Sequence, residues 1–273
     1  QSEQSRTAVR FENRRFRRFN NITQLISFSD NLLYISGQGQ QKQGSFYCSN
    51  AFSKTKFNAF KEEREEELIY SIRSLGEEEI DAVLKDVNRF ALKSQPEFKT
   101  NQDPSTPCNT FISSLYQKER LLFLLRYGLA YVEEHSKDGT IQLQKHVMRY
   151  PQFFATKAIE DAIGKGVKKG VIWHTQGSGK TALSYFNIRY LTNYFSKQEI
   201  VPQFYFVVDR LDLADQATRE FTKRGLKVKR INRPQELNEK HDAYQVAVVN
   251  IQKFKDNSDL TDHSGYDLNR QNI

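Results

Sequence analysis

The sequence predicts an α/β fold whose second half holds a parallel β-sheet. Short apolar runs at residues 171–173, 204–208 and 246–249 are rich in β-branched and aromatic side chains. Segments of helical length separate the runs, and a glycine-rich loop follows the first one. Strands and helices that alternate in this way form βαβ units, whose strands are parallel. We therefore expect an incomplete parallel sheet, preceded by a helical connector and by a small mixed α/β segment.

Residues 1–53 predict the small mixed segment. Arginines and phenylalanines are interleaved over residues 1–20, a combination that suits contacts with phosphates and bases, although a solvated terminus explains it as well. Residues 22–36 partly alternate apolar and polar side chains, which predicts two strands that turn at Asp30 and Asn31. Residues 37–53 are rich in Gly, Gln and Ser and predict a loop or an irregular strand.

Helical periodicity dominates the chain after Phe57, with Gly76 between two candidate helices in residues 61–93. The acidic run from Glu62 to Glu67 is interpreted as a solvated helix face, because closely spaced carboxylates on a helix point around the cylinder and do not converge on a metal ion. Three prolines in residues 94–110 predict a loop or connection, and a helix is expected over residues 113–131. A short strand over residues 140–149 and a helix that starts at Pro151 complete the connector.

Composition excludes several classes of protein. Hydrophobic residues make up 38% and charged residues 27% of the 273 residues, which is typical of globular proteins with about 100 to 200 residues per domain. Lys and Arg number 41 against 33 Asp and Glu, and the net charge of +8 is compatible with an anionic partner. Cys48 and Cys108 have no metal or disulfide spacing, and no apolar run has the roughly 20 residues of a membrane helix. We therefore expect a cytoplasmic location.

The segment Thr175-Gln-Gly-Ser-Gly-Lys-Thr181 carries the chemistry. Its glycines allow backbone N–H groups to close around phosphate oxygens, and the helix that follows directs its positive end at the same anion. Lys180 would reach the β- and γ-phosphates of a nucleotide, and the Thr181 hydroxyl would bind Mg²⁺. His174 occupies the position of the first glycine in the pattern G-x-x-x-x-G-K-[ST], and we expect it to shape the loop. The following helix should bury Leu183, Phe186 and Tyr190.

With its surroundings, this loop resembles motif I of superfamily 2 helicases and translocases. The tetrapeptide Arg149-Tyr-Pro-Gln152 is similar to their adenine-reading Q-tip motif. The segment FVVDRLDLADQ, with Asp209, Arg210 and Gln216, resembles motif Ia, and VVNIQKF at residues 248–254 resembles the strand and turn before the DEAD/DEAH box. Together with RYPQFFATKAIEDAI, these motifs look like the motor-endonuclease (R) subunit of type I restriction enzymes.

That resemblance covers most of the chain and is weakest over residues 46–107. It implies the C-terminal part of an endonuclease domain at residues 1–60, a mostly helical connector at 61–148 and the N-terminal part of a first RecA-like motor domain at 149–273. Asn250 stands where the family more often has Thr, and no DExx sequence follows IQKF. We therefore expect a piece that ends before the DEAH box and is inactive alone.

The family's function implies a set of cofactors, partners and site residues for this chain. R subunits of the family couple ATP hydrolysis to double-stranded DNA translocation and endonucleolytic cleavage, in a complex with methylation and specificity subunits. ATP and Mg²⁺ are the implied cofactors, with Lys180 and Thr181 as catalytic residues and Thr181 as the Mg²⁺ ligand. The implied ATP-binding residues are Arg149, Gln152, Thr175, Gly177, Ser178, Gly179, Lys180 and Thr181. The implied DNA-binding residues are Asp209, Arg210, Gln216 and Lys253.

Alternatives remain open at this point. The chain could come from another superfamily 2 DNA helicase or translocase with an unrelated accessory domain, or from a non-catalytic interaction module with a decayed P-loop. The basic stretch at residues 219–233 suits sequence-independent contacts with DNA phosphates, but lysines on a sheet edge that discourage pairing explain it equally well.

Overall fold

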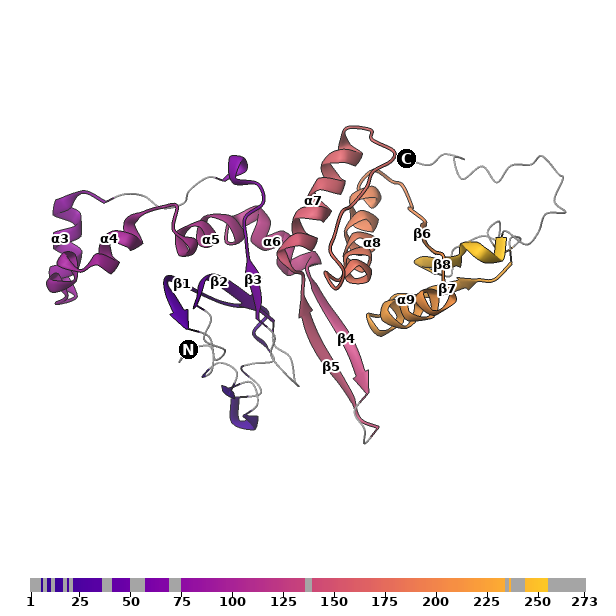
Figure 1. The fold of residues 1–273 in the computed structure, drawn as a ribbon, viewed down its shortest axis with the longest axis horizontal. Coiled ribbons are helices and arrows are strands. Elements are labelled where there is room, and N and C mark those ends of the chain that lie inside the picture. The colour runs from indigo at the N-terminus through magenta and orange to yellow at the C-terminus, as the bar shows by residue number, and fades with distance from the viewer. Residues whose placement is uncertain are drawn as a thin grey trace. The chain divides into compact units, whose positions relative to one another are not determined.

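The structure is a computed structural model that divides into two compact units (Figure 1). The first unit comprises Gln1–Leu129 with Lys145–Tyr150, and the second comprises Ala130–Gln144 with Pro151–Ile273. The expected division into three segments, at residues 60 and 148, stays a prediction. The structure describes residues 6, 9–10, 13–16, 19, 22–35, 41–49, 57–68, 75–135, 139–233, 236 and 244–254.

An antiparallel sheet of order β1-β2-β3 forms the first unit's β layer, from β1 (Ile26–Ile35), β2 (Gln41–Cys48) and β3 (Asn58–Phe60). The expected turn at Asp30 and Asn31 is wrong, because β1 runs through both residues as one strand. β2 pairs with both ends of β1, and the register shifts between Asp30 and Tyr34. Asp30 and Asn31 lie at the start of this irregularity, within the strand. The Asn31 side chain accepts a 2.8 Å hydrogen bond from the Cys108 N–H.

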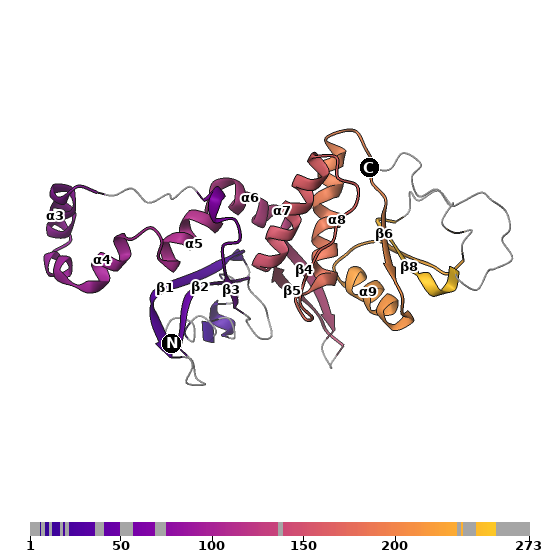
Figure 2. The same ribbon diagram turned by 45° about the horizontal axis from the view of Figure 1, so that its top comes forward.

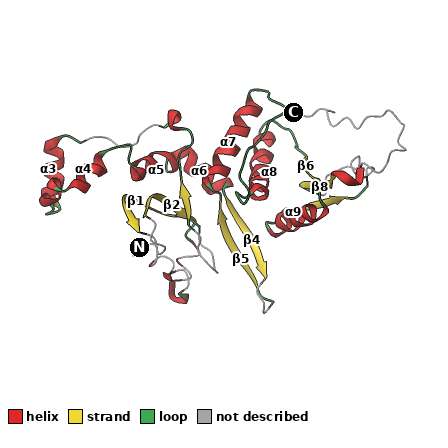
Figure 3. Cartoon of the chain, in the orientation of Figure 1, coloured by secondary structure: helices red, strands yellow, loops and turns green. Residues whose placement is uncertain are grey.

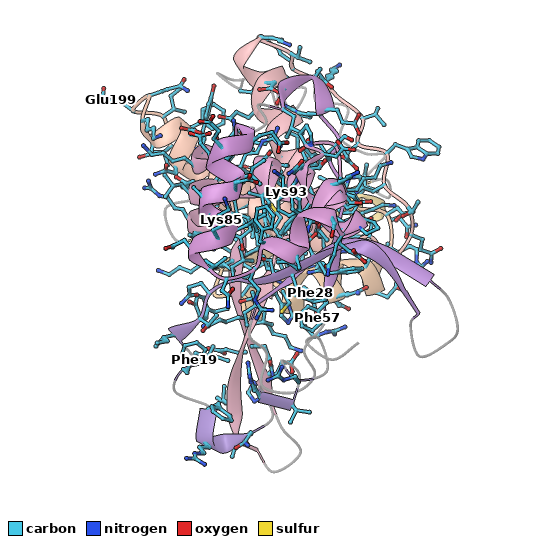
Figure 4. All side chains as sticks on the ribbon, turned by 90° about the vertical axis from the view of Figure 1, so that its left-hand side faces the viewer. Phe19, Phe28, Phe57, Lys85, Lys93 and Glu199 are labelled. Carbon is cyan, nitrogen blue, oxygen red and sulfur yellow. The ribbon has the colours of Figure 1, made fainter. Side chains whose placement is uncertain are left out.

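Aromatic rings pack against both faces of this sheet, because Phe28 and Phe60 hold alternate positions in its register. The rings of Phe28 in β1 and Phe57, next to β3, meet edge to face at a centroid distance of 5.0 Å (Figure 4). Phe60 meets Phe111 of α5 in the same geometry at 5.1 Å. β3 thus ends directly before the first candidate helix, and its residues pair with β2 and supply a ring to the core.

Helices α3 (Glu77–Asp86), α4 (Pro96–Gln102), α5 (Pro107–Leu115) and α6 (Lys118–Tyr127) complete the first unit. α4 and α5 both begin at a proline, so two of the three prolines expected to mark a loop start helices instead, while Pro104 lies in the turn between them. α5 packs against β1 and β2, as the turned view in Figure 2 also shows. The helix expected over residues 113–131 is interrupted after Leu115 and ends at Gly128. β4 (Leu129–His135) follows it and pairs with β5 (Ile141–Val147) in a separate two-stranded sheet.

Glu62 corrects the interpretation of the acidic run as a solvated helix face. Its side chain is only 1% exposed, and Oε2 accepts hydrogen bonds from the Ser114 hydroxyl and, at 2.7 Å, from the Arg120 guanidinium. Oε1 accepts the backbone N–H of Arg64 at 2.8 Å. The carboxylate is buried because these partners neutralise and satisfy it, whereas Glu65 remains exposed.

The second unit contains a parallel sheet of order β6-β8-β7, built from β6 (Phe204–Val208), β7 (Val228–Ile231) and β8 (Val246–Asn250). α9 (Leu211–Lys223) contacts all three strands. The strands expected at residues 204–208 and 246–249 are confirmed, and their parallel pairing is confirmed as well. Residues 228–231 of the basic stretch form β7, one of the two edge strands of the described sheet.

The strand expected at residues 171–173 is wrong. These residues form no strand in the described structure, and Val171 and Trp173 are 90% and 91% exposed. A strand exists only where a neighbour satisfies its backbone groups, and within the described sheet β6 and β7 pair only with β8. Apolar composition alone therefore does not place this segment in the sheet.

Two helices, α7 (Tyr150–Gly164) and α8 (Lys180–Ser196), lie side by side in the second unit (Figures 1 and 3). The Lys157 ammonium of α7 lies 6.0 Å from the centre of the Tyr190 ring of α8. Leu183, Phe186 and Tyr190 are 4%, 2% and 8% exposed, which confirms their predicted burial. No helix in the described residues has the length and hydropathy needed to span a membrane.

Candidate functional site

The glycine-rich segment forms a loop that ends where α8 begins. The Ser178 N–H donates a 3.3 Å hydrogen bond to the Thr175 carbonyl, which closes a turn. Gly177 and Gly179 have φ angles of +77° and +85°, in the left-handed region that glycine enters without a steric penalty. α8 then starts at Lys180 with no acidic side chain in its first turn. The free N–H groups of that turn thus present a positive end that acidic residues of the same turn do not neutralise.

Gln152, in the first turn of α7, holds this loop. The residue is 3% exposed, and its Nε2 donates to the carbonyls of Gly179 at 2.9 Å and Ser178 at 3.3 Å. A Cβ at residue 179 would lie 2.5 Å from Nε2, closer than such atoms approach. Glycine at residue 179 therefore suits both the φ angle and the space beside the Gln152 amide.

The side chains of the loop suit a polyphosphate anion. The Ser178 hydroxyl is buried and has no hydrogen-bond partner in the described structure. Lys180 is exposed and Thr181 is half-buried at the start of α8. A hydroxyl, an ammonium group and helix N–H groups together match the oxygen atoms of a phosphate chain, and a threonine hydroxyl can supply one oxygen ligand to Mg²⁺. Of the described residues, no group of three or more His, Cys, Asp and Glu side chains could hold a metal ion by itself.

The structure brings together only some of the predicted nucleotide residues. Gln152 contacts Ser178 and Gly179 directly, whereas Arg149 belongs to the first unit, so its predicted place beside the loop stays a prediction. The sequence indicated Gln152 as an adenine reader and missed its contact with the loop. No local sequence pattern predicts a contact between a glutamine and a glycine-rich loop that are 26 residues or more apart.

The predicted DNA-contact residues lie at and after the carboxyl ends of parallel strands. Asp209 and Arg210 follow β6, and Lys253 lies in the 3-10 helix Ile251–Phe254 that follows β8. Since Val208 pairs with Asn250, the segments after β6 and β8 start at the same edge of the sheet. Ligands of open α/β sheets gather at that edge.

Arg210 is held by Asp212 at the start of α9. The guanidinium Nε donates to Oδ1 at 3.1 Å, and a second nitrogen pairs with Oδ2. These hydrogen bonds lower the pKa of the Asp212 carboxyl and raise the pKa of Arg210. The side chains are 62% and 63% exposed. Gln216 lies four residues after Asp212 on α9 and is also exposed, so both face the same side of the helix.

Asn250 ends β8 with a fully buried side chain. Its Oδ1 accepts a 2.9 Å hydrogen bond from the Gln252 N–H, which turns the chain from the strand into the 3-10 helix. This position, where the family more often has Thr, is thus a backbone-turning site in this chain.

The basic stretch 219–233 divides into paired and exposed residues. Arg224 forms an ion pair with Glu220 and lies over the Tyr185 ring, and Arg230 forms an ion pair with Asp215 at 3.3 Å. These two arginines support the contacts of α9. The basic residues that remain exposed are Arg219, Lys223, Lys227 and Arg233.

Known proteins are similar to the part of the chain that holds this site. Residues 151–273, which include the loop, α8 and the parallel sheet, match the SWI2/SNF2 ATPase family. The putative type I restriction enzyme MjaVIIP endonuclease subunit of Methanocaldococcus jannaschii is 44% identical over 108 residues, 37% of this chain and 10% of that protein. The chain is a relative of type I restriction endonuclease subunits. The resemblance inferred from the motifs is therefore confirmed.

Other relatives carry the same description. The type I restriction enzyme SauCOLORF180P endonuclease subunit of Staphylococcus aureus strain COL is 35% identical over 112 residues, 39% of this chain and 11% of that protein. The putative type I restriction enzyme MjaIXP endonuclease subunit of Methanocaldococcus jannaschii is 27% identical over 188 residues, 64% of this chain and 17% of that protein. The chain thus spans 10 to 17% of the length of these three relatives.

Proposed function

We propose that this chain binds ATP with Mg²⁺ at the loop Thr175–Thr181, as part of a type I restriction enzyme R subunit. The observation that carries the proposal is the pair of left-handed glycines, Gly177 and Gly179, directly before α8 in a segment that matches an ATPase family. This conformation turns successive backbone N–H groups toward one anion, which is what a phosphate chain requires.

Each residue of the loop has a proposed role. Gly177 turns the chain, the backbone N–H groups from Gly179 to Thr181 and the Ser178 hydroxyl bind phosphate oxygens, and Lys180 neutralises the β- and γ-phosphates. The Thr181 hydroxyl supplies a ligand to Mg²⁺. Thr175 starts the loop, and Arg149 and Gln152 belong to the adenine side of the site. Gln152 also keeps Ser178 and Gly179 in place.

The proposed activity of the parent enzyme is ATP hydrolysis coupled to translocation on double-stranded DNA and to endonucleolytic cleavage. Its proposed partners are DNA and the methylation and specificity subunits of the restriction complex. Turnover also needs a carboxylate on Mg²⁺ and a positioned water, and we assign neither to a residue of this chain. We therefore propose nucleotide binding without turnover for this chain by itself.

The DNA would contact the carboxyl edge of the parallel sheet. Arg210 and Lys253 supply positive charge after β6 and β8, while Asp209 and Gln216 supply hydrogen-bonding groups. The contacts of Arg210 and Lys253 to phosphates would bind without regard to sequence, as a translocating motor requires.

Titration with a fluorescent ATP analogue tests the nucleotide site. The unaltered chain should bind only when Mg²⁺ is present, and Lys180→Ala should weaken binding at least about tenfold, because a charged hydrogen bond contributes about 1.5 to 3 kcal/mol. Lys168→Ala is the matched control, since Lys168 is an exposed lysine outside the loop. Equal losses in both variants, or no binding by the unaltered chain, would overturn the proposal.

The assembled restriction enzyme tests the motor function. Lys180→Ala in its R subunit should abolish ATP-dependent movement along DNA, while the subunit keeps its fold. Translocation at the unaltered rate would show that Lys180 has no role in the motor.

A further inference from the structure

His174 stands where a phosphate loop of the usual pattern begins with glycine. It directly precedes the turn that the Ser178 N–H closes on the Thr175 carbonyl. Its side chain is half-buried, and its Nδ1 is completely buried with no hydrogen-bond partner in the described part of the chain. The sequence offered only a shape-determining role for this residue, and that role leaves Nδ1 unexplained.

A buried nitrogen without a partner is costly, since it loses its hydrogen bonds to water and gains none. Ser178, at the other end of the same turn, has a buried hydroxyl in the same condition. His174 and Ser178 flank the turn in sequence. A bound phosphate chain would give hydrogen-bond partners to both His174 Nδ1 and Ser178 Oγ.

We propose that His174 is a nucleotide-contacting residue whose Nδ1–H donates a hydrogen bond to a phosphate oxygen of the bound nucleoside triphosphate. The inference rests on the proposed nucleotide site and adds a side-chain donor to it. A neutral imidazole carries one N–H, so this contact requires the proton on Nδ1 and leaves Nε2 as an acceptor. Glycine at this position would provide no such donor.

Three substitutions separate this role from a purely structural one. Asn places its amide near the position of Nδ1, Gln extends its amide toward the position of Nε2, and Gly restores the usual loop pattern. If Nδ1 contacts the phosphate, His174→Asn should bind the Mg²⁺ complex of the ATP analogue within about threefold of the unaltered chain, and both His174→Gln and His174→Gly should bind about tenfold more weakly.

The decisive comparison is with His174→Gly. Binding by this variant as tight as that of the unaltered chain would overturn the inference, because the glycine loop would then be sufficient. Denaturant unfolding of each variant identifies any that fails to fold. For that case the ¹⁵N resonance of His174 Nδ1 in the unaltered chain gives an independent answer: a shift on addition of the Mg²⁺ nucleotide supports the contact, and no shift overturns it.

The outcome is distinguishable from failure of the nucleotide site itself. If Lys180→Ala abolishes binding while every His174 variant binds normally, the phosphate loop stands and only the role of His174 is wrong. If the unaltered chain binds no nucleotide, the proposed site fails first.

Discussion

The side-chain amide of Gln152 donates a 2.9 Å hydrogen bond to the backbone carbonyl of Gly179. This hydrogen bond joins the first turn of α7 to the residue that immediately precedes α8. That residue, Gly179, has a left-handed φ angle, which glycine adopts readily. The loop's shape is therefore fixed from two directions, by the φ angles of its glycines and by a buried side chain from another helix. A ligand that binds this loop would meet a site arranged in advance, which lowers the entropic cost of binding.

Gly179→Ala should disrupt both constraints. The new Cβ would sit 2.5 Å from Gln152 Nε2, and a non-glycine residue at a φ of +85° costs about 1 to 2 kcal/mol by itself. We expect a loss of about 2 to 4 kcal/mol in the free energy of unfolding from the two effects together, measured by denaturant titration, and a loss of nucleotide affinity.

Two other glycines serve as controls for that substitution. Gly177→Ala meets the same left-handed strain, at a φ of +77°, but nothing lies within 4 Å of the added Cβ. Gly170→Ala has open space and no left-handed φ. The expected order of destabilisation is Gly179, then Gly177, then Gly170. Equal effects at Gly179 and Gly177 would mean that the contact with Gln152 contributes nothing.

Local sequence patterns predicted the parts of the fold that local interactions determine. The turn of the glycine loop and the helical repeat of α8, with its buried residues Leu183, Phe186 and Tyr190, are local features of the sequence, whereas the contact of Gln152 with the loop is not. Strands β6 and β8 were also predicted, because their continuous apolar runs suit burial within a parallel sheet.

The predictions that were wrong depended on partners far away in sequence. Residues 171–173 have the composition of a strand, yet strand formation depends on which segment pairs with them. Asp30 and Asn31 favour a turn, but pairing with β2 on both sides keeps them in one strand. Glu62 is one of several glutamates, and only its neighbours Ser114 and Arg120, more than 50 residues away, bury it.

Arg120→Ala should be among the most damaging substitutions in the first unit. Arg120 neutralises Glu62, whose side chain is 1% exposed, and its removal would leave a buried carboxylate without its countercharge. Breaking such a pair costs about 3 to 5 kcal/mol, so the free energy of unfolding should fall by that amount.

A second substitution tests the cause. In Arg120→Ala with Glu62→Gln the unpaired charge is gone, while the amide oxygen can still accept the Arg64 N–H and the amide NH₂ can donate to the Ser114 hydroxyl oxygen. The double variant should therefore be more stable than Arg120→Ala alone. If it is less stable, packing of the arginine rather than charge explains the loss.

The two cysteines should differ in reactivity. Cys48 is fully buried, and burial raises the pKa of its thiol to about 12, whereas Cys108 is half-buried in α5. Only the thiolate reacts, so at pH 8 the native chain should show one fast thiol in a disulfide-exchange assay, and Cys108→Ser should remove it. Both thiols should react after unfolding. Fast reaction of Cys108→Ser would contradict the described burial of Cys48.

The raised pKa of Cys48 also sets the sign of a pH effect on stability. The folded state keeps a proton that the unfolded chain loses above its ordinary thiol pKa, so Cys48 favours the unfolded state increasingly as pH rises toward about 12. Cys48→Ala should flatten the decline of stability over that alkaline range. If the free energy of unfolding of Cys48→Ala declines with pH as steeply as that of the unaltered chain, other groups cause the decline.

Arg210 offers a test of DNA contact at the carboxyl edge of the sheet. The guanidinium is 62% exposed and already oriented by Asp212, so it can reach a phosphate without first being ordered. Arg210→Ala should weaken binding of the chain to duplex DNA and lower the slope of log affinity against log salt by about 1, because one phosphate contact is lost. Fluorescence anisotropy at several salt concentrations measures both quantities.

Asp212→Ala is the matched control for Arg210→Ala. It breaks the same ion pair but leaves the arginine and removes a negative charge, so the affinity for DNA should hold or rise. If both variants lose affinity equally, the pair acts by supporting α9, and Arg210 does not contact DNA.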